Sequence, residues 1–111
     1  MTKTVFTVKE GRIVRIEVNG HTGYAAEGED ILCAAISAVL QGAVLGVMEV
    51  AKARVEYQTD ARKGSMRFAL MEEEDQQVLH DAEVILRSAL VATRDIAEGY
   101  SQFVKVEVKE L

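Results

Sequence analysis

Hydrophobic and polar residues alternate in five short stretches of the chain, the period expected of β-strands that have one face in water. These stretches are residues 4–9, 12–19, 54–59, 65–71 and 103–109. Glu10 and Gly11 separate the first two, and a two-residue connection with glycine available for positive φ predicts a β-hairpin. In the second strand we expect Val14, Ile16 and Val18 to face the core.

Two longer segments have helical periodicity instead. Residues 75–98 carry one apolar stripe, made of Val78, Ala82, Ile85, Ala89, Thr93 and Ile96, and Gly99 is a natural stop after it. Residues 31–52 are apolar nearly all round but contain Ser37, Gln41 and two glycines, which favours a buried helix over a membrane span. One sheet face covers only part of such a helix, so the surplus apolar surface suggests a homodimer.

The order of these elements, β-β-α-β-β-α-β, indicates a two-layer α+β fold. We expect one mostly antiparallel sheet with both helices on one of its faces. At 111 residues, the chain is the length of one ordinary domain, so a single domain over residues 1–111 is expected.

Composition and charge narrow the classes of function. Hydrophobic residues are 49% and charged residues 28% of the chain, which excludes a disordered protein. The formal net charge of −5 argues against sequence-independent binding to nucleic acid and suits a basic partner. Residues 1–9 alternate and include two lysines, without the apolar core of a signal peptide, so we expect a cytoplasmic protein with no membrane partner.

Cysteine and histidine are scarce. Cys33 is the single cysteine, so it forms no intramolecular disulfide and has no second thiol for a Cys-rich metal site. His80 lies two positions from Val78 on the second helix and is expected to point away from the apolar stripe. We therefore expect neither a metal site nor a cofactor.

The segment between the second strand and the first helix has the composition of a functional loop. Gly20, Gly23 and Gly28 make it conformationally permissive, and it is long for a connection in a compact domain. Asp30 stands just before the apolar helical run and is the expected N-cap. Counting from that cap places Cys33 at the third helical position, in the first turn.

A cysteine in the first turn of a helix is suited to nucleophilic catalysis. The free N–H groups and the helix dipole stabilise a thiolate there, and the same N–H groups can receive the oxyanion of a tetrahedral intermediate. His21 can act as base toward the Cys33 thiol and then as acid toward a leaving amine. Asp30 can orient His21, and Ser37 lies one turn after Cys33 on the same helical face.

Each of these residues also has an ordinary structural interpretation. A lone cysteine in an alanine-rich helix, such as Cys33, is usually a small buried hydrophobe, and a histidine in a glycine-rich loop, such as His21, is usually a turn or surface residue. Asp30 needs no role beyond the N-cap, and Ser37 can bond back to the carbonyl four residues earlier. Tyr24 is either a half-buried loop aromatic or a contact for an apolar substrate side chain.

The whole segment favours the catalytic interpretation. Residues 20–37 read Gly-His-x-Gly-Tyr-Ala-x-x-Gly-x-Asp-Ile-x-Cys-Ala-Ala-x-Ser, which resembles the signature of the ribosomal-processing cysteine protease family, Prp. The resemblance implies a cysteine endopeptidase in which Cys33 matches the nucleophile and His21 the catalytic histidine. Asp30 and Ser37 match further positions of the signature.

The resemblance also implies a substrate and an assembly. Members of the family are homodimers that remove a short N-terminal extension from large ribosomal subunit protein twenty-seven, cutting after an aromatic residue. Their glycine-rich loop closes over the substrate. An acidic protein that meets a basic ribosomal one fits this expectation.

Two other functions are compatible with the same residues. The chain can be a non-catalytic ribosome-assembly or protein-binding module whose loop grips a partner. Alternatively, Cys33 can be a redox sensor that forms a sulfenic acid or an intermolecular disulfide, although the chain has no resolving cysteine. A peptide-cleavage assay distinguishes both from a protease.

Overall fold

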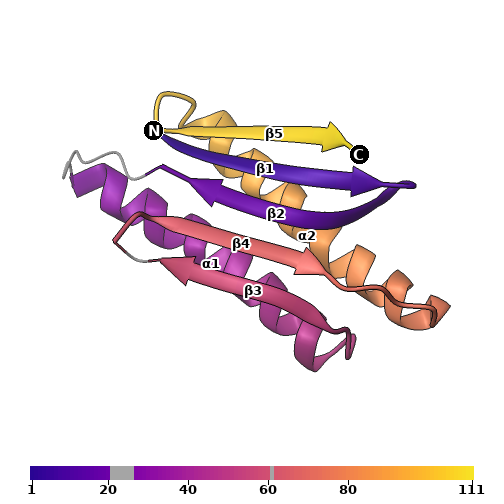
Figure 1. The fold of residues 1–111 in the computed structure, drawn as a ribbon. Coiled ribbons are helices and arrows are strands. Elements are labelled where there is room, and N and C mark those ends of the chain that lie inside the picture. Colours follow the sequence, from indigo (N-terminus) through magenta and orange to yellow (C-terminus); the bar gives the residue numbers. More distant parts are fainter. Residues whose placement is uncertain (21–26, 61) are drawn as a thin grey trace.

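The computed structural model describes residues 1–20, 27–60 and 62–111. Within these residues the elements follow in the predicted order, β-β-α-β-β-α-β (Figure 1). The strands are β1 (Thr2–Lys9), β2 (Arg12–Asn19), β3 (Val55–Asp60), β4 (Ser65–Leu70) and β5 (Val104–Glu110), and the helices are α1 (Glu27–Glu49) and α2 (Gln76–Gly99).

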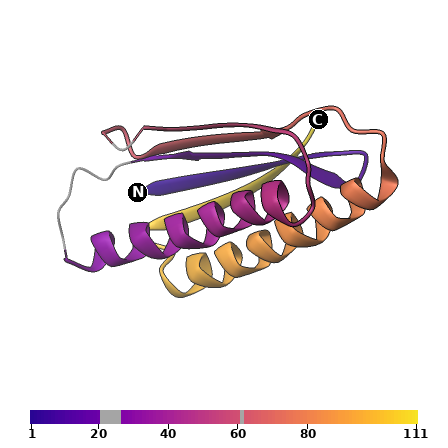
Figure 2. The same ribbon diagram turned by 90° about the horizontal axis from the view of Figure 1, so that it is seen from below.

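The strands form one sheet in the order β3-β4-β2-β1-β5. Neighbouring strands are antiparallel except β1 and β5, which are parallel. Helices α1 and α2 make a second layer against one face of the sheet (Figure 2). The predicted two-layer α+β fold is therefore confirmed.

The connections between strands explain why both helices lie on the same face. The chain crosses from β2 over β4 to β3 through α1, and from β4 over β2 and β1 to β5 through α2. These crossovers move in opposite directions across the sheet and start from strands that are themselves antiparallel. Parallel crossovers are almost always right-handed, so reversing the direction of the crossover alone would put the second helix on the other face. Reversing the direction of the starting strand as well returns it to the same face as the first helix.

The core fills the space between the two layers. The sheet contributes large, almost fully buried side chains, and each helix contributes a row of aliphatic ones. The main members are Phe6, Ile16 and Phe68 from the sheet, Leu40, Val44 and Val47 from α1, and Leu86 and Leu90 from α2. Ala82, Ala89 and Thr93 of the predicted α2 stripe are also buried, which confirms that face of the helix.

One core position in β2 differs from the prediction. Val14 is half-buried, while Ile13 is 1% exposed and packs in the core. The register of β1 against β2 shifts between Thr7 and Val8, so β2 carries an extra residue there and its alternation changes face. The N–H of Ile13 donates instead to Glu83 Oε1 on α2 at 2.9 Å. A bulge cannot be inferred from alternation alone, and this one ties the hairpin to α2.

Helix α1 is longer at its start than predicted. It begins at Glu27 rather than at Ile31. By length and composition its stretch Ile31–Glu49 is apolar enough to cross a membrane. In the fold one side of it lies against the sheet and contributes to the core, but only 33% of the stretch is buried, so the expectation of a buried helix holds for that side alone.

Candidate active site

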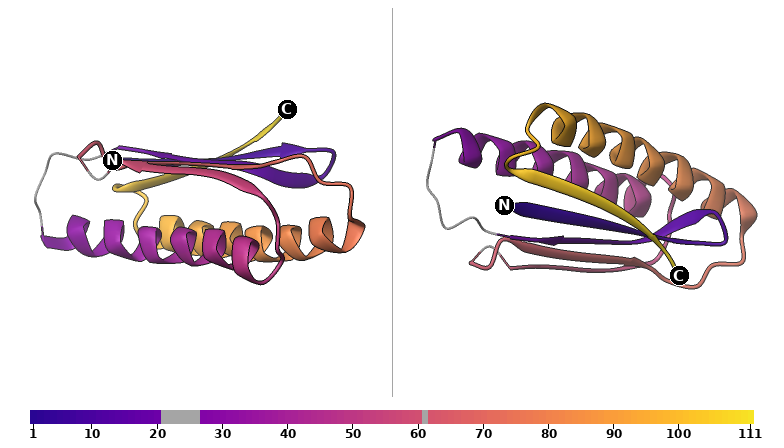
Figure 3. Two further views of the ribbon diagram at one scale, coloured as in Figure 1. Left: turned by 60° about the horizontal axis from the view of Figure 1, so that its bottom comes forward. Right: turned by 90° about the horizontal axis from the view of Figure 1, so that it is seen from above.

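The predicted functional segment adjoins one end of the molecule. The N-terminus, the start of α1, and the turn between β3 and β4 lie at this end (Figure 3). The connection from α2 to β5 lies there as well, because Thr2 of β1 pairs with Val104 at the start of β5. Four segments that are distant in sequence therefore lie at the same end of the molecule as the start of α1.

Cys33 lies one turn deeper in α1 than its predicted place. With the helix beginning at Glu27, Asp30 is inside the first turn and is not the N-cap, and Cys33 belongs to the second turn. The N–H of Cys33 then bonds to the carbonyl of Glu29, as in any regular helix interior. The helix start is about 9 Å away along the axis, so its free N–H groups are not adjacent to this residue.

This placement overturns two expectations about Cys33: stabilisation of its thiolate by the start of the helix, and binding of an oxyanion by the first-turn N–H groups. The stabilisation of an anion by the helix dipole falls off within the first turn, so it acts only weakly at Cys33. The first-turn N–H groups likewise do not serve as oxyanion donors for a reaction at the Cys33 sulfur. The first helix was expected to start later because Gly28 favours a loop, although the acidic residues next to it in the sequence favour a helix start.

The Cys33 side chain is half-buried and has a polar neighbour on the sheet. The Thr2 hydroxyl oxygen lies 3.6 Å from the Cys33 sulfur, a distance at which either atom can donate. The same hydroxyl donates to the carbonyl of Gly20 at 3.3 Å. Thr2 was missed because the first strand was expected to begin at Thr4, although the β-branched Thr2 and Thr4 have the spacing of one strand face.

Gly20 ends β2 in a conformation that requires glycine. Its φ is +112°, and a Cβ at this position would collide with the backbone carbonyl of Met1 and approach the Cα of Thr2 to 3.1 Å. The close contact is between two backbones, so no rotamer change relieves it. Among the predicted loop glycines, Gly20 is therefore one whose lack of a side chain is required by the structure: it lets the chain after β2 lie against the chain before β1.

The remaining predicted site residues divide into two groups. Ser37 is exposed on α1, one turn after Cys33, as expected. Gly28 belongs to the helical backbone of the first turn. His21, Gly23 and Tyr24 lie outside the described residues. The structure therefore brings together Cys33, Gly20 and Thr2.

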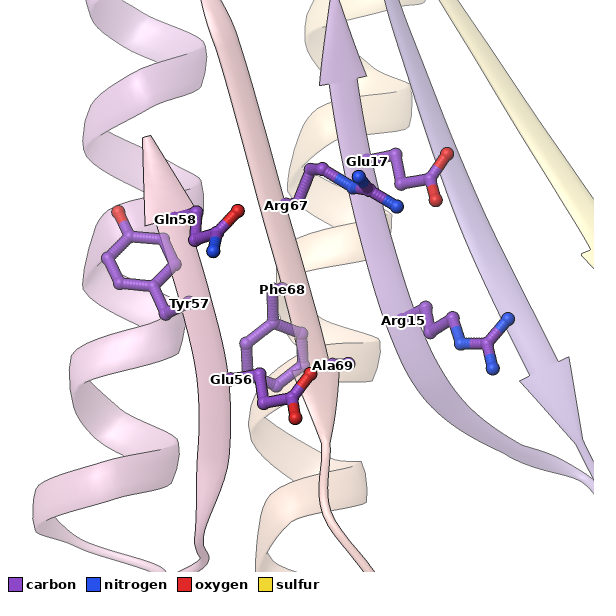
Figure 4. Close-up of a pocket in the computed structure, with 8 residues that line it drawn as sticks. All are labelled: Arg15, Glu17, Glu56, Tyr57, Gln58, Arg67, Phe68 and Ala69. Atoms are coloured by element: carbon purple, nitrogen blue, oxygen red, sulfur yellow. The ribbon is translucent and has the colours of Figure 1, made fainter. Parts of the chain in front are cut away.

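A separate hollow of about 810 Å³ lies on the sheet over β2, β3 and β4 (Figure 4). Its lining is mostly charged and polar, and consists of Arg15, Glu17, Glu56, Tyr57, Gln58, Arg67, Phe68 and Ala69. Partial burial raises the pKa of Tyr57 above its ordinary value of 10.0. Cys33 and Thr2 do not line this hollow, so it is distinct from the candidate active site.

His80 is exposed on α2, as predicted. Across residues 1–20, 27–60 and 62–111, no three His, Cys, Asp or Glu side chains are grouped as metal ligands. The arrangement around Cys33 thus consists of a thiol, a hydroxyl and a backbone carbonyl, which is a set suited to holding a nucleophile.

Comparison with known proteins decides between the candidate classes. The family model of cysteine protease Prp matches residues 1–105. This chain belongs to the Prp family. The matched range includes the positions of Cys33 and His21, and membership of the family makes the protein a cysteine peptidase.

Curated Prp sequences cover most of the chain. The ribosomal processing cysteine protease Prp of Staphylococcus aureus is 27% identical over 100 residues, which are 90% of this chain and 91% of that protein. The Prp of Bacillus subtilis is 27% identical over 94 residues, covering 85% of this chain and 84% of the relative.

Solved Prp structures have the same fold. The S. aureus Prp crystallised with a substrate peptide has a TM-score of 0.85 and 25% identity, with 98% of this chain and 100% of that one covered. A Streptococcus mutans protein has a TM-score of 0.87 at 22% identity, covering 100% of this chain and 96% of the other, which supports the fold alone.

Proposed function

We propose that this protein is an endopeptidase that removes the N-terminal extension of large ribosomal subunit protein twenty-seven, with Cys33 as nucleophile and His21 as general base. The observation that carries the proposal is the Prp family match over residues 1–105, which contains both residues. Related proteins are named ribosomal processing cysteine proteases, and one was crystallised with a substrate peptide. A half-buried thiol beside a hydroxyl suits this role.

The reaction proceeds through a thioester. His21 takes the proton of the Cys33 thiol, and the sulfur attacks the carbonyl carbon of the scissile bond to form a C–S bond. The tetrahedral intermediate collapses as the C–N bond breaks, and His21 gives its proton to the leaving amine. Water, deprotonated by His21, then attacks the thioester carbon to form a C–O bond. The C–S bond breaks, the acid leaves, and His21 returns the proton to the sulfur to regenerate the thiol.

The other signature residues have supporting roles in this proposal. Asp30 orients His21, and Ser37 contacts bound substrate from one turn further along α1. Gly23 gives the segment between Gly20 and the helical Gly28 freedom to close over the peptide, and Tyr24 contacts an apolar substrate side chain. The whole of residues 1–111 acts as one protease domain in the cytoplasm, without a cofactor and without direct binding to nucleic acid or membrane.

The net charge supports the choice of a ribosomal substrate. The chain carries 18 acidic and 13 basic residues, so it attracts a basic polypeptide over a distance set by the ionic strength. We expect cleavage of a basic ribosomal peptide to slow as salt is added, mainly through KM. An uncharged peptide with the same residues around the cut serves as the control.

A peptide-cleavage assay tests the proposed function. The purified protein and its Cys33→Ala and His21→Ala variants are incubated with a peptide that spans the extended N-terminus of the ribosomal protein, and products are identified by mass spectrometry. We expect one cut after an aromatic residue by the wild type and a loss of at least about a hundredfold in both variants. Circular dichroism of each variant verifies folding.

The same assay identifies the alternative functions. If the folded wild type leaves the peptide intact while Cys33→Ala still binds it, the protein is a binding module toward that peptide. If Cys33 is instead oxidised by dilute peroxide to a sulfenic acid without any cleavage, the redox function is favoured.

We also propose that the protein is a homodimer joined through α1. The outer face of this helix has exposed residues at a three-four spacing: Ile31, Ala34, Ala38, Gln41, Leu45 and Met48. Ile31 is 67% and Leu45 57% exposed, which is unusual for aliphatic side chains on a helix without a partner. This spacing is that of helices that pair along one seam, and a twofold axis lets the same stripe contact itself.

A further inference from the structure

Thr2 contacts Cys33 and Gly20, the residue that precedes His21 in the sequence. Its hydroxyl lies 3.6 Å from the Cys33 sulfur and 3.3 Å from the carbonyl oxygen of Gly20. That carbonyl belongs to the peptide bond that leads into His21. A single side chain thus links the sulfur to the backbone of the residue that precedes the proposed base in the sequence.

The Thr2 side chain is held firmly in place. The residue is 5% exposed, and its N–H donates to the carbonyl of Phe103 at 2.8 Å. On its other side, the backbone of Gly20 approaches so closely that no Cβ fits. A β-branched side chain also has restricted χ1 freedom, so its hydroxyl oxygen has little room to leave Cys33.

The chemistry of the hydroxyl depends on the state of the cysteine. A threonine hydroxyl has one proton to donate and two lone pairs to accept with. Beside a neutral thiol, it can accept from the S–H while it donates to the Gly20 carbonyl. Beside a thiolate, which only accepts, the hydroxyl can turn its proton toward the sulfur in a charge-assisted bond.

We propose that Thr2 is a positioning residue for the Cys33 nucleophile, whose hydroxyl fixes the sulfur beside Gly20 and donates to the thiolate when the thiol loses its proton. This inference rests on the proposed role of Cys33. The hydroxyl offsets part of the loss of helix-dipole stabilisation that follows from the place of Cys33 in the second turn.

Thr4 provides a matched control within the same strand. It lies two residues after Thr2 on the same face of β1 and is 0% exposed. Its hydroxyl has no hydrogen-bond partner among the described residues. Thr4 therefore differs from Thr2 in the property under test, which is the contact that the hydroxyl makes. Replacing either threonine with valine removes a hydroxyl and keeps the shape.

The test compares Thr2→Val, Thr2→Ser and Thr4→Val in the full chain. The first readout is the rate of Cys33 alkylation by iodoacetamide as a function of pH, without any substrate. For Thr2→Val we expect the profile to move to higher pH by about one unit, with alkylation at neutral pH roughly tenfold slower. Thr2→Ser, which keeps the hydroxyl, and Thr4→Val should follow the wild-type profile.

The second readout is peptide cleavage by the same variants. We expect kcat to fall about tenfold in Thr2→Val while KM changes by less than about twofold, since the hydroxyl acts on the sulfur and not on the bound peptide. If Thr2→Val folds poorly, Thr2→Ala removes the same hydroxyl without any risk of overpacking and should give the same shift.

The outcomes separate this inference from the proposed function. An alkylation profile of Thr2→Val and Thr2→Ala that matches Thr4→Val would overturn the positioning role and leave Thr2 as a strand residue. If Thr2→Val shifts the alkylation profile but the wild-type protein cleaves no peptide, the contact between Thr2 and Cys33 is supported and only the proposed function is overturned. Rescue by Thr2→Ser supports the hydroxyl as the responsible group.

Discussion

Gly20 and Met1 approach each other so closely that a single methyl group on Gly20 would overlap the Met1 carbonyl. The contact joins the end of β2 to the residue before β1, and it is followed directly by Thr2, whose hydroxyl bonds to the Gly20 carbonyl. The geometry at Cys33 therefore depends on a backbone contact that involves no catalytic atom.

Gly20→Ala tests this dependence. We expect it to destabilise the fold by about 3 kcal/mol and to slow Cys33 alkylation, since the start of β1 must move and carry Thr2 with it. Gly11→Ala is the control: Gly11 also has positive φ, +80°, but nothing lies within 4 Å of its would-be Cβ. Chemical denaturation should show a larger loss of stability, and alkylation a larger fall in rate, in Gly20→Ala than in Gly11→Ala. Equal effects in the two variants would mean that the positive φ alone, and not the contact with Met1, causes them.

Thr4→Val should stabilise the protein. The Thr4 hydroxyl is buried without a partner among the described residues, and valine has the same shape without the polar atom. Removing an unsatisfied buried hydroxyl is expected to raise the free energy of unfolding by about 1 kcal/mol. Urea denaturation measures the change. A loss of stability would mean that the hydroxyl has a partner in solution.

The bond between Glu83 and the Ile13 N–H should contribute measurably to stability. Glu83→Ala leaves that N–H unpaired beneath the hairpin and also removes the ion pair with Arg87 at 2.7 Å. We expect a loss of about 1–3 kcal/mol. Glu83→Gln keeps an acceptor for Ile13 and loses the charge, so it should cost about 0.5 kcal/mol. Thermal unfolding of both variants distinguishes the two contributions.

Stability should depend on pH through Glu107. Lys3 at 3.3 Å and Lys105 at 3.4 Å favour its ionised form and lower its pKa below the ordinary 4.5, the hydrogen bond from Lys3 being the main cause. A lowered pKa in the folded state means that the contribution is present above the unfolded value and is lost as pH falls through the folded one. Glu107→Gln should therefore match the wild type in acid and be less stable near neutral pH. Because the carboxylate is exposed, added salt should reduce this difference.

The proposed dimer predicts a change of mass on substitution of the α1 stripe. Leu45→Glu places a charge on the exposed seam, so we expect it to halve the mass measured by light scattering after size exclusion. Val91→Glu, on α2 and 60% exposed in the wild type, should leave the mass unchanged. A monomeric wild type at micromolar concentration would contradict the dimer.

The fold was largely predictable because its signals are local. The alternation of β4 and the stripe of α2 each extend over several residues. Asp75, expected as the first residue of the second helix, is instead its N-cap and accepts from the N–H groups of Gln77 and Val78. Element order then restricts the topology to one with both helices on a single face.

The differences arose where a distant contact determines the conformation. The bulge that turns Ile13 inward is fixed by Glu83, seventy residues further on, and Thr2 joins the sheet because β5 pairs with it. The start of α1 was misjudged because Gly28 favoured a loop while its acidic neighbours favour a helix. The family signature predicts Cys33 as the nucleophile, and that role stays a prediction; nothing in the signature indicates Thr2.

The parallel pairing of β1 with β5 also affects the order in which the site can be completed during synthesis. Thr2 is made among the first residues, but the carbonyl that fixes its backbone belongs to Phe103. A nascent chain that has reached only α2 therefore holds Cys33 opposite a strand whose outer edge is still unpaired. The backbone of Thr2, and with it the hydroxyl beside the thiol, acquires its final surroundings only when the last strand docks.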